Sequence, residues 1–535
     1  MQVERWRAAF WDFTSKANFE NPFMDVSIKA EFTGPSGRKI IREAYWDGEN
    51  QYKVSFAPQE EGIWAWKINA PQETGLNGKN GTFECIPYTG ELDIYKHGFL
   101  KVAGRGSYLS YDDGTPFFWL GDTHWAFING EKWEESNHPK MDSMFKGMVD
   151  LRKKQGYTVY QTNLRPENRF RFNCTHYWED GKEGILPNVG YFQTEVDKRM
   201  AYLADNGFVN ALGFAWFISG LTSLTTMKSL ARYIIARYGC YPIVWTLAGE
   251  VAGYFPEARE ATVNAWREIA LLVEELDGGC NTLQTAHYTN ERPFAADYQN
   301  ENWFDFTLNQ AGHGDYVISA KDYLDYRKKF PNKPFVEGES MYEFVYTLEE
   351  NGGRTATAAM VRHAAYTAMQ CGACGYTYGA QGIWDTVWEK PEKSDYHNAF
   401  NPLGVTWYEA VDGVGGEQMG YMRQFYEKYH FEELYPAGNC YYVKGKKIDN
   451  DQFDMFRPLV SGNHDMSTVV LYYNTFSRHL DATLTCLQGK PYRMAWFNPR
   501  TNEETIIEEA ILPVNGKLPV PTRPDGDDWL LTLTC

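Results

Sequence analysis

The sequence has little basic charge for its length, and it has no long apolar run. Its 52 Lys and Arg are outnumbered by 70 Asp and Glu, which leaves a formal net charge of -18 over 535 residues. No Lys/Arg-rich run offsets this acidity, so nucleic acid and anionic membrane surfaces are poor partners. No stretch approaches the roughly 18 consecutive apolar residues that a membrane-spanning helix needs, and we expect no membrane span.

The chain also has few cysteines and no leader pattern. Nine cysteines, an odd number, are scattered over the sequence and indicate no disulfide framework. The segment from Met1 to Trp6 has neither the basic nor the apolar part of a secretory signal. We therefore expect a protein of the reducing cytoplasm, unless a leader has been removed from the chain.

Aromatic residues, in contrast, are abundant, at 16% of the chain. Rings on this scale often line concave binding sites, although most of them must form the core. The first 88 or so residues alternate apolar and polar side chains between turn signals, as in Val26 to Phe32 and Tyr52 to Phe56. This pattern predicts a small antiparallel β-sandwich over residues 1–90. Trp64 and Trp66 in this region could bind sugar, but packing between the two sheets is the preferred interpretation.

The middle of the chain, residues 91–435, alternates apolar strands with amphipathic helices. Eight strand candidates can be counted, at residues 117–120, 157–160, 208–212, 243–247, 282–285, 304–308, 334–336 and 373–376. Strands buried on both sides and joined by helices form parallel sheets, and eight of them over this length favour a closed (β/α)8 barrel. Helices are predicted from Asp142 to Gly156, from Thr194 to Gly207, and through Val263 and Val273 to Gly278. Residues 436–535 return to strand alternation and predict a second β-sandwich.

Polar and aromatic residues follow nearly every predicted barrel strand. In a (β/α)8 barrel the segments after the strands meet at one rim, and this rim holds the active site. The candidate substrate-binding residues at this rim are Asp122, His124, Trp125, Gln161, Trp216, His287, Gln310, His313, Tyr342, Tyr378 and Trp384. Carboxylates, amides and flat rings together are typical of a sugar-binding site, so we expect a carbohydrate substrate.

Two rim glutamates, Glu250 and Glu339, each follow a glycine at the end of strands four and seven. Strands three apart in an eight-stranded ring can aim side chains at each other across the mouth. Carboxyl groups about 5–5.5 Å apart define a retaining glycosidase, with one nucleophile and one acid/base. The acid/base needs a raised pKa, which burial and a neighbouring carboxylate supply.

Other interpretations of these residues stay open. Most of the 70 acidic residues must be solvated surface charges. His124, His287 and His313 could ligate a metal, but they lack the close spacing of zinc motifs, and we predict neither metal nor cofactor. Cys371 and Cys374 have CxxC spacing without a second pair, which favours a small-residue strand over a redox or zinc site. Asp122 is a candidate for tying the first loop to its neighbours.

Four strand-end motifs together resemble the apiosidase-like glycoside hydrolases. They are Phe118-Trp-Leu-Gly-Asp-Thr-His-Trp125, Ile243-Val-Trp-Thr-Leu-Ala-Gly-Glu250, Lys333-Pro-Phe-Val-Glu-Gly-Glu-Ser-Met-Tyr-Glu343 and Gly375-Tyr-Thr-Tyr-Gly-Ala-Gln-Gly-Ile-Trp384. The resemblance implies a barrel enzyme with a β-sandwich before it and a second one, labelled in some members as collagen-binding, after it. It also implies that Glu250 is the acid/base and Glu339 the nucleophile. Relatives usually carry Gly-Asp where this chain has Gly-Glu250.

The sequence thus predicts a retaining glycoside hydrolase that acts on chain ends. A terminal pentofuranoside of plant-derived oligosaccharides or glycosides is the first expected substrate, and a hexopyranoside is the second. Two alternatives remain: a transglycosylase, in which Trp216, Trp384 and Trp388 favour a sugar acceptor, and a non-catalytic carbohydrate-binding protein. The chain is also a candidate for homo-oligomer formation.

Overall fold

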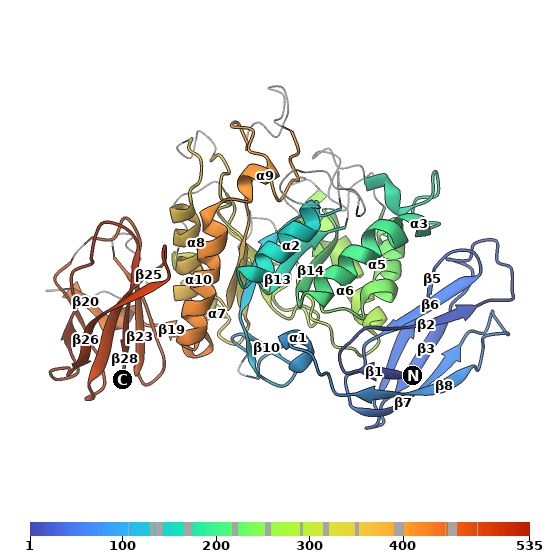
Figure 1. The fold of residues 1–535 in the computed structure, drawn as a ribbon, viewed down its shortest axis with the longest axis horizontal. Coiled ribbons are helices and arrows are strands. Elements are labelled where there is room, and N and C mark those ends of the chain that lie inside the picture. The colour runs from blue at the N-terminus through green and yellow to red at the C-terminus, as the bar shows by residue number, and fades with distance from the viewer. Residues whose placement is uncertain are drawn as a thin grey trace.

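The computed structural model has a central barrel with one β-sandwich on each side (Figure 1). It describes residues 1–104, 106–128, 133, 143–164, 174–216, 223–251, 258–288, 293–313, 320–347, 353–389, 401–443, 446–447, 457–478 and 480–535. In Figure 1 the N-terminal strands, in blue, and the C-terminal strands, in red, lie on opposite sides of the barrel. The predicted fold class is confirmed, while the predicted boundaries near residues 90 and 435 stay predictions.

The N-terminal part contains a five-stranded sheet, in the order β1-β8-β7-β3-β4, and a three-stranded sheet, in the order β2-β6-β5. All its strand pairs are antiparallel except β1 with β8. The bounds are β1 Gln2–Glu4, β2 Ala9–Thr14, β3 Lys29–Thr33, β4 Lys39–Glu43, β5 Tyr45–Trp46, β6 Gln51–Phe56, β7 Gly62–Asn69 and β8 Asn80–Ile86. Trp64 is fully buried and packs on Phe56 and Phe83, so its role is sheet packing.

The barrel sheet has seven parallel strands in the order β15-β14-β13-β12-β18-β17-β16. Their bounds are β12 Trp119–Thr123, β13 Val159–Asn163, β14 Val209–Ala215, β15 Ile243–Ala248, β16 Thr307–Gln310, β17 Phe335–Glu339 and β18 Gly375–Tyr378. The predicted fifth strand appears as two isolated parallel bridges, from Gln284 to Trp245 of β15 and from His287 to Leu308 of β16. These bridges join the two edges of the sheet, so residues 284–287 close the barrel.

Helices surround the barrel strands, and smaller elements join the barrel to the first sandwich. The helices are α1 Asp93–Lys96, α2 Met144–Lys154, α3 Val189–Tyr191, α4 Asp197–Asp205, α5 Leu224–Tyr238, α6 Arg259–Asp277, α7 Ala320–Lys329, α8 Ala358–Gln370, α9 Trp407–Ala410 and α10 Val414–Lys428. A three-stranded sheet of β9 Leu100–Val102, β10 Leu109–Tyr111 and β11 Pro116–Phe117 precedes β12. None of the helices in the described ranges is both long and apolar enough to cross a membrane.

The three predicted helices differ from the observed ones mainly at their first residues. Ser143, whose side chain accepts from the Lys146 N–H, caps α2, and Asp142 lies outside the described residues. The helix expected to begin at Thr194 begins earlier: Asn188 caps α3, and a π-helical segment, Phe192–Val196, joins α3 to α4. Gly278 ends α6 with a φ of 63°, as the glycine predicts.

The C-terminal part has a six-stranded sheet, β19-β22-β23-β28-β25-β26, and a four-stranded sheet, β21-β20-β24-β27. The bounds are β19 Tyr435–Pro436, β20 Tyr441–Val443, β21 Lys446–Lys447, β22 Leu459–Gly462, β23 Thr468–Tyr473, β24 Ala482–Leu484, β25 Tyr492–Asn498, β26 Glu503–Ile511, β27 Leu518–Pro519 and β28 Trp529–Thr534. Leu471, Leu531 and Trp496 pack in one core between the two sheets.

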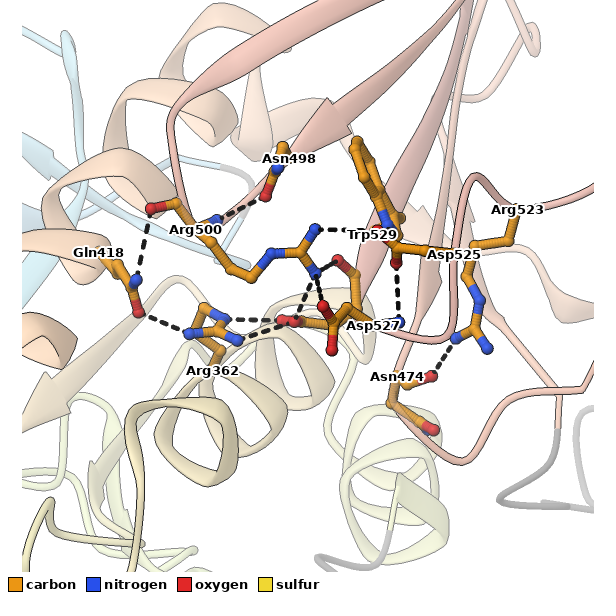
Figure 2. Close-up of polar contacts among 10 residues, drawn as sticks. Arg362, Gln418, Asn474, Asn498, Arg500, Arg523, Asp525, Asp527 and Trp529 are labelled. Atoms are coloured by element: carbon orange, nitrogen blue, oxygen red, sulfur yellow. Dashed lines mark hydrogen bonds and ion pairs between the residues drawn. The ribbon is translucent and has the colours of Figure 1, made fainter.

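A buried ion pair fastens this second sandwich to the barrel (Figure 2). Arg362 of α8 donates from Nε and Nη2 to the two carboxylate oxygens of Asp528, at 2.7 and 2.8 Å. Its Nη1 donates to Gln418 of α10, and Gln418 in turn donates to the backbone carbonyl of Arg500. This bidentate ion pair between Arg362 and Asp528 holds the sandwich against the face of the barrel that α8 and α10 form.

Candidate active site

The glutamate at the end of β17 reaches the barrel mouth because of a β-bulge at Gly338. Asn309 of β16 pairs with Glu337, but the next residue, Gln310, pairs with Glu339, so Gly338 is an extra residue. A Cβ at Gly338 would overlap the side chain of Leu308, which explains the glycine. Bulges redirect side chains, and this one turns Glu339 into the mouth while Glu337 points outward to Tyr323 of α7.

The end of β15 is irregular as well, just before Glu250. Leu212 of β14 pairs with Trp245, but Gly213 pairs with Leu247, whose φ is 61°. Left-handed backbone at a leucine is strained, and such strain often occurs at functional sites. A Cβ at Gly249 would overlap the ring of Trp216, so glycine here lets the Trp216 ring lie against the chain beside Glu250.

The two glutamates meet at the side-chain amide of Gln310. Its Nε2 donates to Oε1 of Glu250 and to Oε1 of Glu339, each at 3.0 Å. These two carboxylate oxygens can therefore lie no further apart than twice that distance. The structure thus brings the predicted pair together at one end of the barrel.

Two histidines also contact the Glu339 carboxylate, one at each oxygen. The Nε2 atom of His313 lies 3.0 Å from Oε1, and that of His287 lies 3.2 Å from Oε2. Burial alone would raise the pKa of Glu339, but the hydrogen bonds and charges of these histidines outweigh burial and hold its pKa well below its usual range. The Glu339 side chain is therefore ionised at neutral pH.

His313 is the reciprocal partner in this arrangement. Its Nδ1 lies 2.6 Å from the backbone carbonyl of Ser340, so both ring nitrogens face oxygen acceptors. Burial lowers the pKa of His313, but the hydrogen bond and charge of Glu339 outweigh it and raise the pKa above its ordinary value. The protonated form of His313 is therefore favoured beside Glu339.

Aromatic rings form the walls beside the carboxylates. Trp125 makes edge contacts with Trp216, at a centroid distance of 5.2 Å, and with His287, at 4.9 Å. Trp384 packs against the Trp125–Trp216 pair. The Tyr342 ring lies 4.3 Å from that of His313, and the Glu339 charge adds to burial in raising the pKa of Tyr342 well above its ordinary value. Aromatic rings therefore surround the Glu339 carboxylate and its histidine partners.

Four other predicted site residues contact the protein elsewhere. Asp122 accepts a 2.9 Å hydrogen bond from Arg152 of α2, and Tyr378 donates to Glu343 at 2.7 Å. His124 lies 2.8 Å from the hydroxyl of Tyr160, and burial lowers its pKa to about 3. Gln161 points into the barrel and donates to the backbone carbonyl of Gly338. Asp122, His124 and Tyr378 therefore lie on the helix side of the sheet.

The histidines do not form a common metal site. His124 lies near Tyr160 and Thr386, while His287 and His313 lie on either side of Glu339. Among the residues that the structure describes, no three His, Cys, Asp or Glu side chains come together as metal ligands would. Cys371 and Cys374 are buried, and burial raises the pKa of both thiols, which suits neither redox chemistry nor zinc binding.

Sequence reasoning missed two backbone carbonyls and one buried carboxylate. The Gly249 carbonyl lies within hydrogen-bond distance of Nδ1 of His287, and the Ser340 carbonyl does so for Nδ1 of His313. These contacts orient the two rings. No side-chain pattern signals such groups. The carboxylate is that of Glu337, which the sequence shows directly before Gly338-Glu339 but whose outward direction depends on the bulge.

A (β/α)8 barrel with two carboxylates and aromatic walls at its mouth defines the class: the protein is a glycoside hydrolase. Residues 104–433 match the family model described as "Apiosidase-like, catalytic domain". The chain therefore belongs to the apiosidase-like family. Residues 2–71 match a domain of unknown function (DUF5060), and residues 457–534 match the "Putative collagen-binding domain of a collagenase".

Several solved structures have the same fold. One, a putative glycoside hydrolase from Bacteroides vulgatus, is 18% identical with a TM-score of 0.71, over 100% of this chain and 99% of that one. Another, described as a glycoside hydrolase, is 20% identical with a TM-score of 0.65, over 84% of this chain and 98% of the other. A family 5 glycoside hydrolase from Bacteroides vulgatus is 19% identical with a TM-score of 0.64, over 82% of this chain and 94% of that one. No curated protein matches the sequence.

Proposed function

We propose that the protein is a retaining glycoside hydrolase in which Glu339 is the nucleophile and Glu250 the acid/base. The observation that carries the proposal is the shared contact with Gln310, whose Nε2 is 3.0 Å from an oxygen of each glutamate. Retaining enzymes have carboxyl groups about 5–5.5 Å apart, whereas inverting enzymes leave about 6.5–9.5 Å for a water molecule. Oxygens held this close favour the retaining geometry.

The electrostatics support the assignment of roles. Glu339 is buried, ionised and held by His287 and His313, which is what a carboxylate nucleophile requires. Its oxygen attacks the anomeric carbon, while Glu250 gives a proton to the departing glycosidic oxygen. Water then gives a proton to Glu250, and the water oxygen displaces Glu339 from the anomeric carbon. The half-buried position of Glu250 suits a group that must exchange protons with water.

For the substrate we propose a terminal pentofuranoside of plant-derived oligosaccharides or glycosides, cleaved from the chain end. Membership in the apiosidase-like family supports a small sugar. Trp384, which is half-buried and packs against Trp125 and Trp216, offers a flat face for the apolar side of such a ring. An enzyme with this preference would act in the cytoplasm on imported oligosaccharides, and a hexopyranoside is the second candidate.

The stereochemistry of the product tests the mechanism. A panel of aryl glycosides identifies a substrate, and proton NMR at early times then records the anomer that is released first. Retention of configuration is expected, and release of the opposite anomer would overturn the proposal. Transglycosylation would appear as a sugar conjugate in place of the free sugar, and a binding protein would show no turnover.

Variants of the two glutamates test their roles. Glu250→Ala should be rescued by azide on substrates with good leaving groups, giving a glycosyl azide of retained configuration. Glu339→Ala should lose turnover. Glu274→Ala is a matched control, because Glu274 of α6 also accepts from a glutamine amide, that of Gln284, but lies away from the mouth. It should keep wild-type turnover, and activity in both single variants of the site would end the assignment.

A further inference from the structure

A second carboxylate on β17, that of Glu337, is buried on the outer side of the barrel sheet. Its exposed fraction is 0%. Oε2 accepts from the Tyr323 hydroxyl and from Nδ2 of Asn309, each at 2.6 Å, and Oε1 accepts from the N–H of Ala311 at 3.0 Å. Three donors from α7, β16 and the segment after β16 thus meet at one side chain.

The Ala311 contact matters because of the residues on each side of it. Gln310, just before it, donates to Glu250 and to Glu339, and His313, two residues after it, lies 3.0 Å from Glu339. The N–H of Gly312 donates to the backbone carbonyl of Glu339 at 3.1 Å. The segment from Gln310 to His313 therefore has one anchor on Glu337 and one on the backbone of Glu339.

We propose that Glu337 is a positioning residue of the active site. It fixes the segment from Gln310 to His313 so that the side chains of Gln310 and His313 contact Glu339. The role in catalysis rests on the proposed function, while the link from Glu337 to His313 does not. Glu337 touches neither the mouth nor a substrate, since the bulge at Gly338 turns it to the outside. Its effect passes through the backbone, at the N–H groups of Ala311 and Glu339.

The surroundings of Glu337 suit a carboxylate with this task. Burial outweighs the donors Tyr323, Asn309 and Ala311, and it raises the pKa of Glu337 to about 7. The titratable groups facing it are Tyr323 of α7 and Tyr376 of β18, and burial raises the pKa of both phenols, which stay neutral. A neutral amide in place of the carboxylate has one acceptor oxygen for three donors.

The variant Glu337→Gln tests the proposal through its pH profile. A carboxamide keeps the size of the side chain but turns one acceptor into a donor, so Ala311 or the pair of Tyr323 and Asn309 loses its partner. We expect kcat to fall about 10- to 100-fold, with a smaller change in KM, because small displacements of catalytic groups cost rates of this size. The acid limb of kcat/KM should move to higher pH, because Glu339 loses part of the hold that lowers its pKa.

Asp305→Asn is the matched control for a purely structural effect. Asp305 lies before β16 at the opposite end of the strand, accepts from the N–H of Gln284 at 2.7 Å, and has a pKa that burial raises to about 7. We expect both Asp305→Asn and Glu337→Gln to lower the melting temperature. Asp305→Asn, however, should leave the pH profile unchanged. The proposal is wrong if Glu337→Gln behaves like Asp305→Asn, with lower stability and a wild-type profile.

A titration of His313 tests the link without any turnover. In histidine-labelled protein, the His313 ring signals, assigned with a His313→Gln variant, report its pKa by NMR. In Glu337→Gln this pKa should fall toward the ordinary histidine value, because the Glu339 carboxylate no longer lies against the ring. An unchanged His313 pKa would overturn the proposal even in an active enzyme. A lowered His313 pKa in a protein whose Glu339 and Glu250 variants keep their turnover would uphold the link and reject the proposed function.

Discussion

Two clusters of buried and half-buried polar residues lie at the same end of the barrel but on opposite sides of its sheet. The mouth cluster consists of Glu250, His287, Gln310, His313 and Glu339, with carboxylates that face one another. The outer cluster consists of Asp122, Arg152, Glu343 and Tyr378, with Gly415 at the start of α10.

The clusters differ in how their charges are balanced. In the outer cluster, Arg152 pairs with Asp122 and lies over the ring of Tyr378, while Glu343 accepts from Tyr378 and from the Gly415 N–H. These contacts join β12 and β18 to α2 directly, and β18 to α10 through Glu343, which follows β17. In the mouth, two carboxylates share one amide donor, an arrangement that is poor for stability and useful for chemistry. The outer cluster therefore has the balanced contacts of a structural cluster, and the mouth cluster has the arrangement that the proposed reaction needs.

The largest expected contrast between the clusters is in turnover. Glu339→Gln should reduce kcat by on the order of 10⁶-fold, the size of effect that loss of a nucleophile produces in another hydrolase. Asp122→Asn removes a carboxylate of the outer cluster and should leave kcat of the folded protein within about 3-fold of wild type, since surrounding contacts, not substrate, occupy this residue. Release of an aryl alcohol from a substrate with a good leaving group measures both. Equal losses of kcat in Glu339→Gln and Asp122→Asn would show that both clusters contribute to turnover.

The second contrast is in stability. Arg152→Met leaves Asp122 buried without its partner, and breaking a buried pair in this way costs about 3–5 kcal/mol. Urea unfolding of the variant should show this loss, while kcat of the folded fraction stays close to wild type. The double variant Asp122→Leu/Arg152→Met removes both charges and should recover much of the stability. If the double variant is as unstable as the single one, loss of packing rather than an unpaired charge is the cause.

The sequence carries enough information to predict the strands and the two catalytic candidates. Runs such as Ile243 to Leu247 are apolar on both faces, as a sheet between a filled barrel interior and helices requires, and the rim follows from the strand ends. The fifth strand, predicted at residues 282–285, is observed as isolated bridges, of which that of Gln284 lies within the predicted range and that of His287 lies beyond it. Turn signals and alternation likewise predict both sandwiches.

The direction of each rim side chain could not be predicted. Strict alternation along β17 would put Glu337 and Glu339 on the same face, and the bulge at Gly338 separates them. On β12, where the pairing is regular, Asp122 lies on the outer face with Tyr378 of β18 opposite to it. A bulge depends on contacts between distant parts of the sequence, as at Gly338, where the side chain of Leu308 leaves no room for a Cβ.

The third contrast is in pH dependence and concerns His313. Because its folded pKa is raised, its contribution to stability is fully present below the unfolded pKa of about 6.5 and is lost as pH rises through the folded pKa. Replacement of His313 by Phe should therefore destabilise the protein most near pH 5.5 and least near pH 9. The pKa of Glu339 should rise in the same variant, which moves the acid limb of kcat/KM to higher pH. Urea unfolding and initial rates over this pH range measure the two effects.

For Tyr378→Phe we expect a loss of stability without this pH dependence, because the polar contacts of Tyr378 are with Glu343 and Arg152 and include no histidine. A loss of stability in His313→Phe that is constant from pH 5.5 to 9 would mean that the ring is neutral and that its role is packing.

The smallest contrast compares two buried tyrosines, one from each cluster. Tyr378→Phe removes a hydroxyl that donates to Glu343 at 2.7 Å, and hydrogen bonds to charged groups contribute about 1.5–3 kcal/mol. Tyr342→Phe removes a hydroxyl at the mouth beside Glu339 and should raise KM about 10-fold, equivalent to about 1.4 kcal/mol of binding, with a smaller effect on stability. Urea unfolding and KM on one aryl glycoside measure both variants. If Tyr378→Phe lowers mainly the stability and Tyr342→Phe raises mainly KM, the two clusters have separate roles. A raised KM in Tyr378→Phe would mean that the outer cluster affects substrate binding across the sheet.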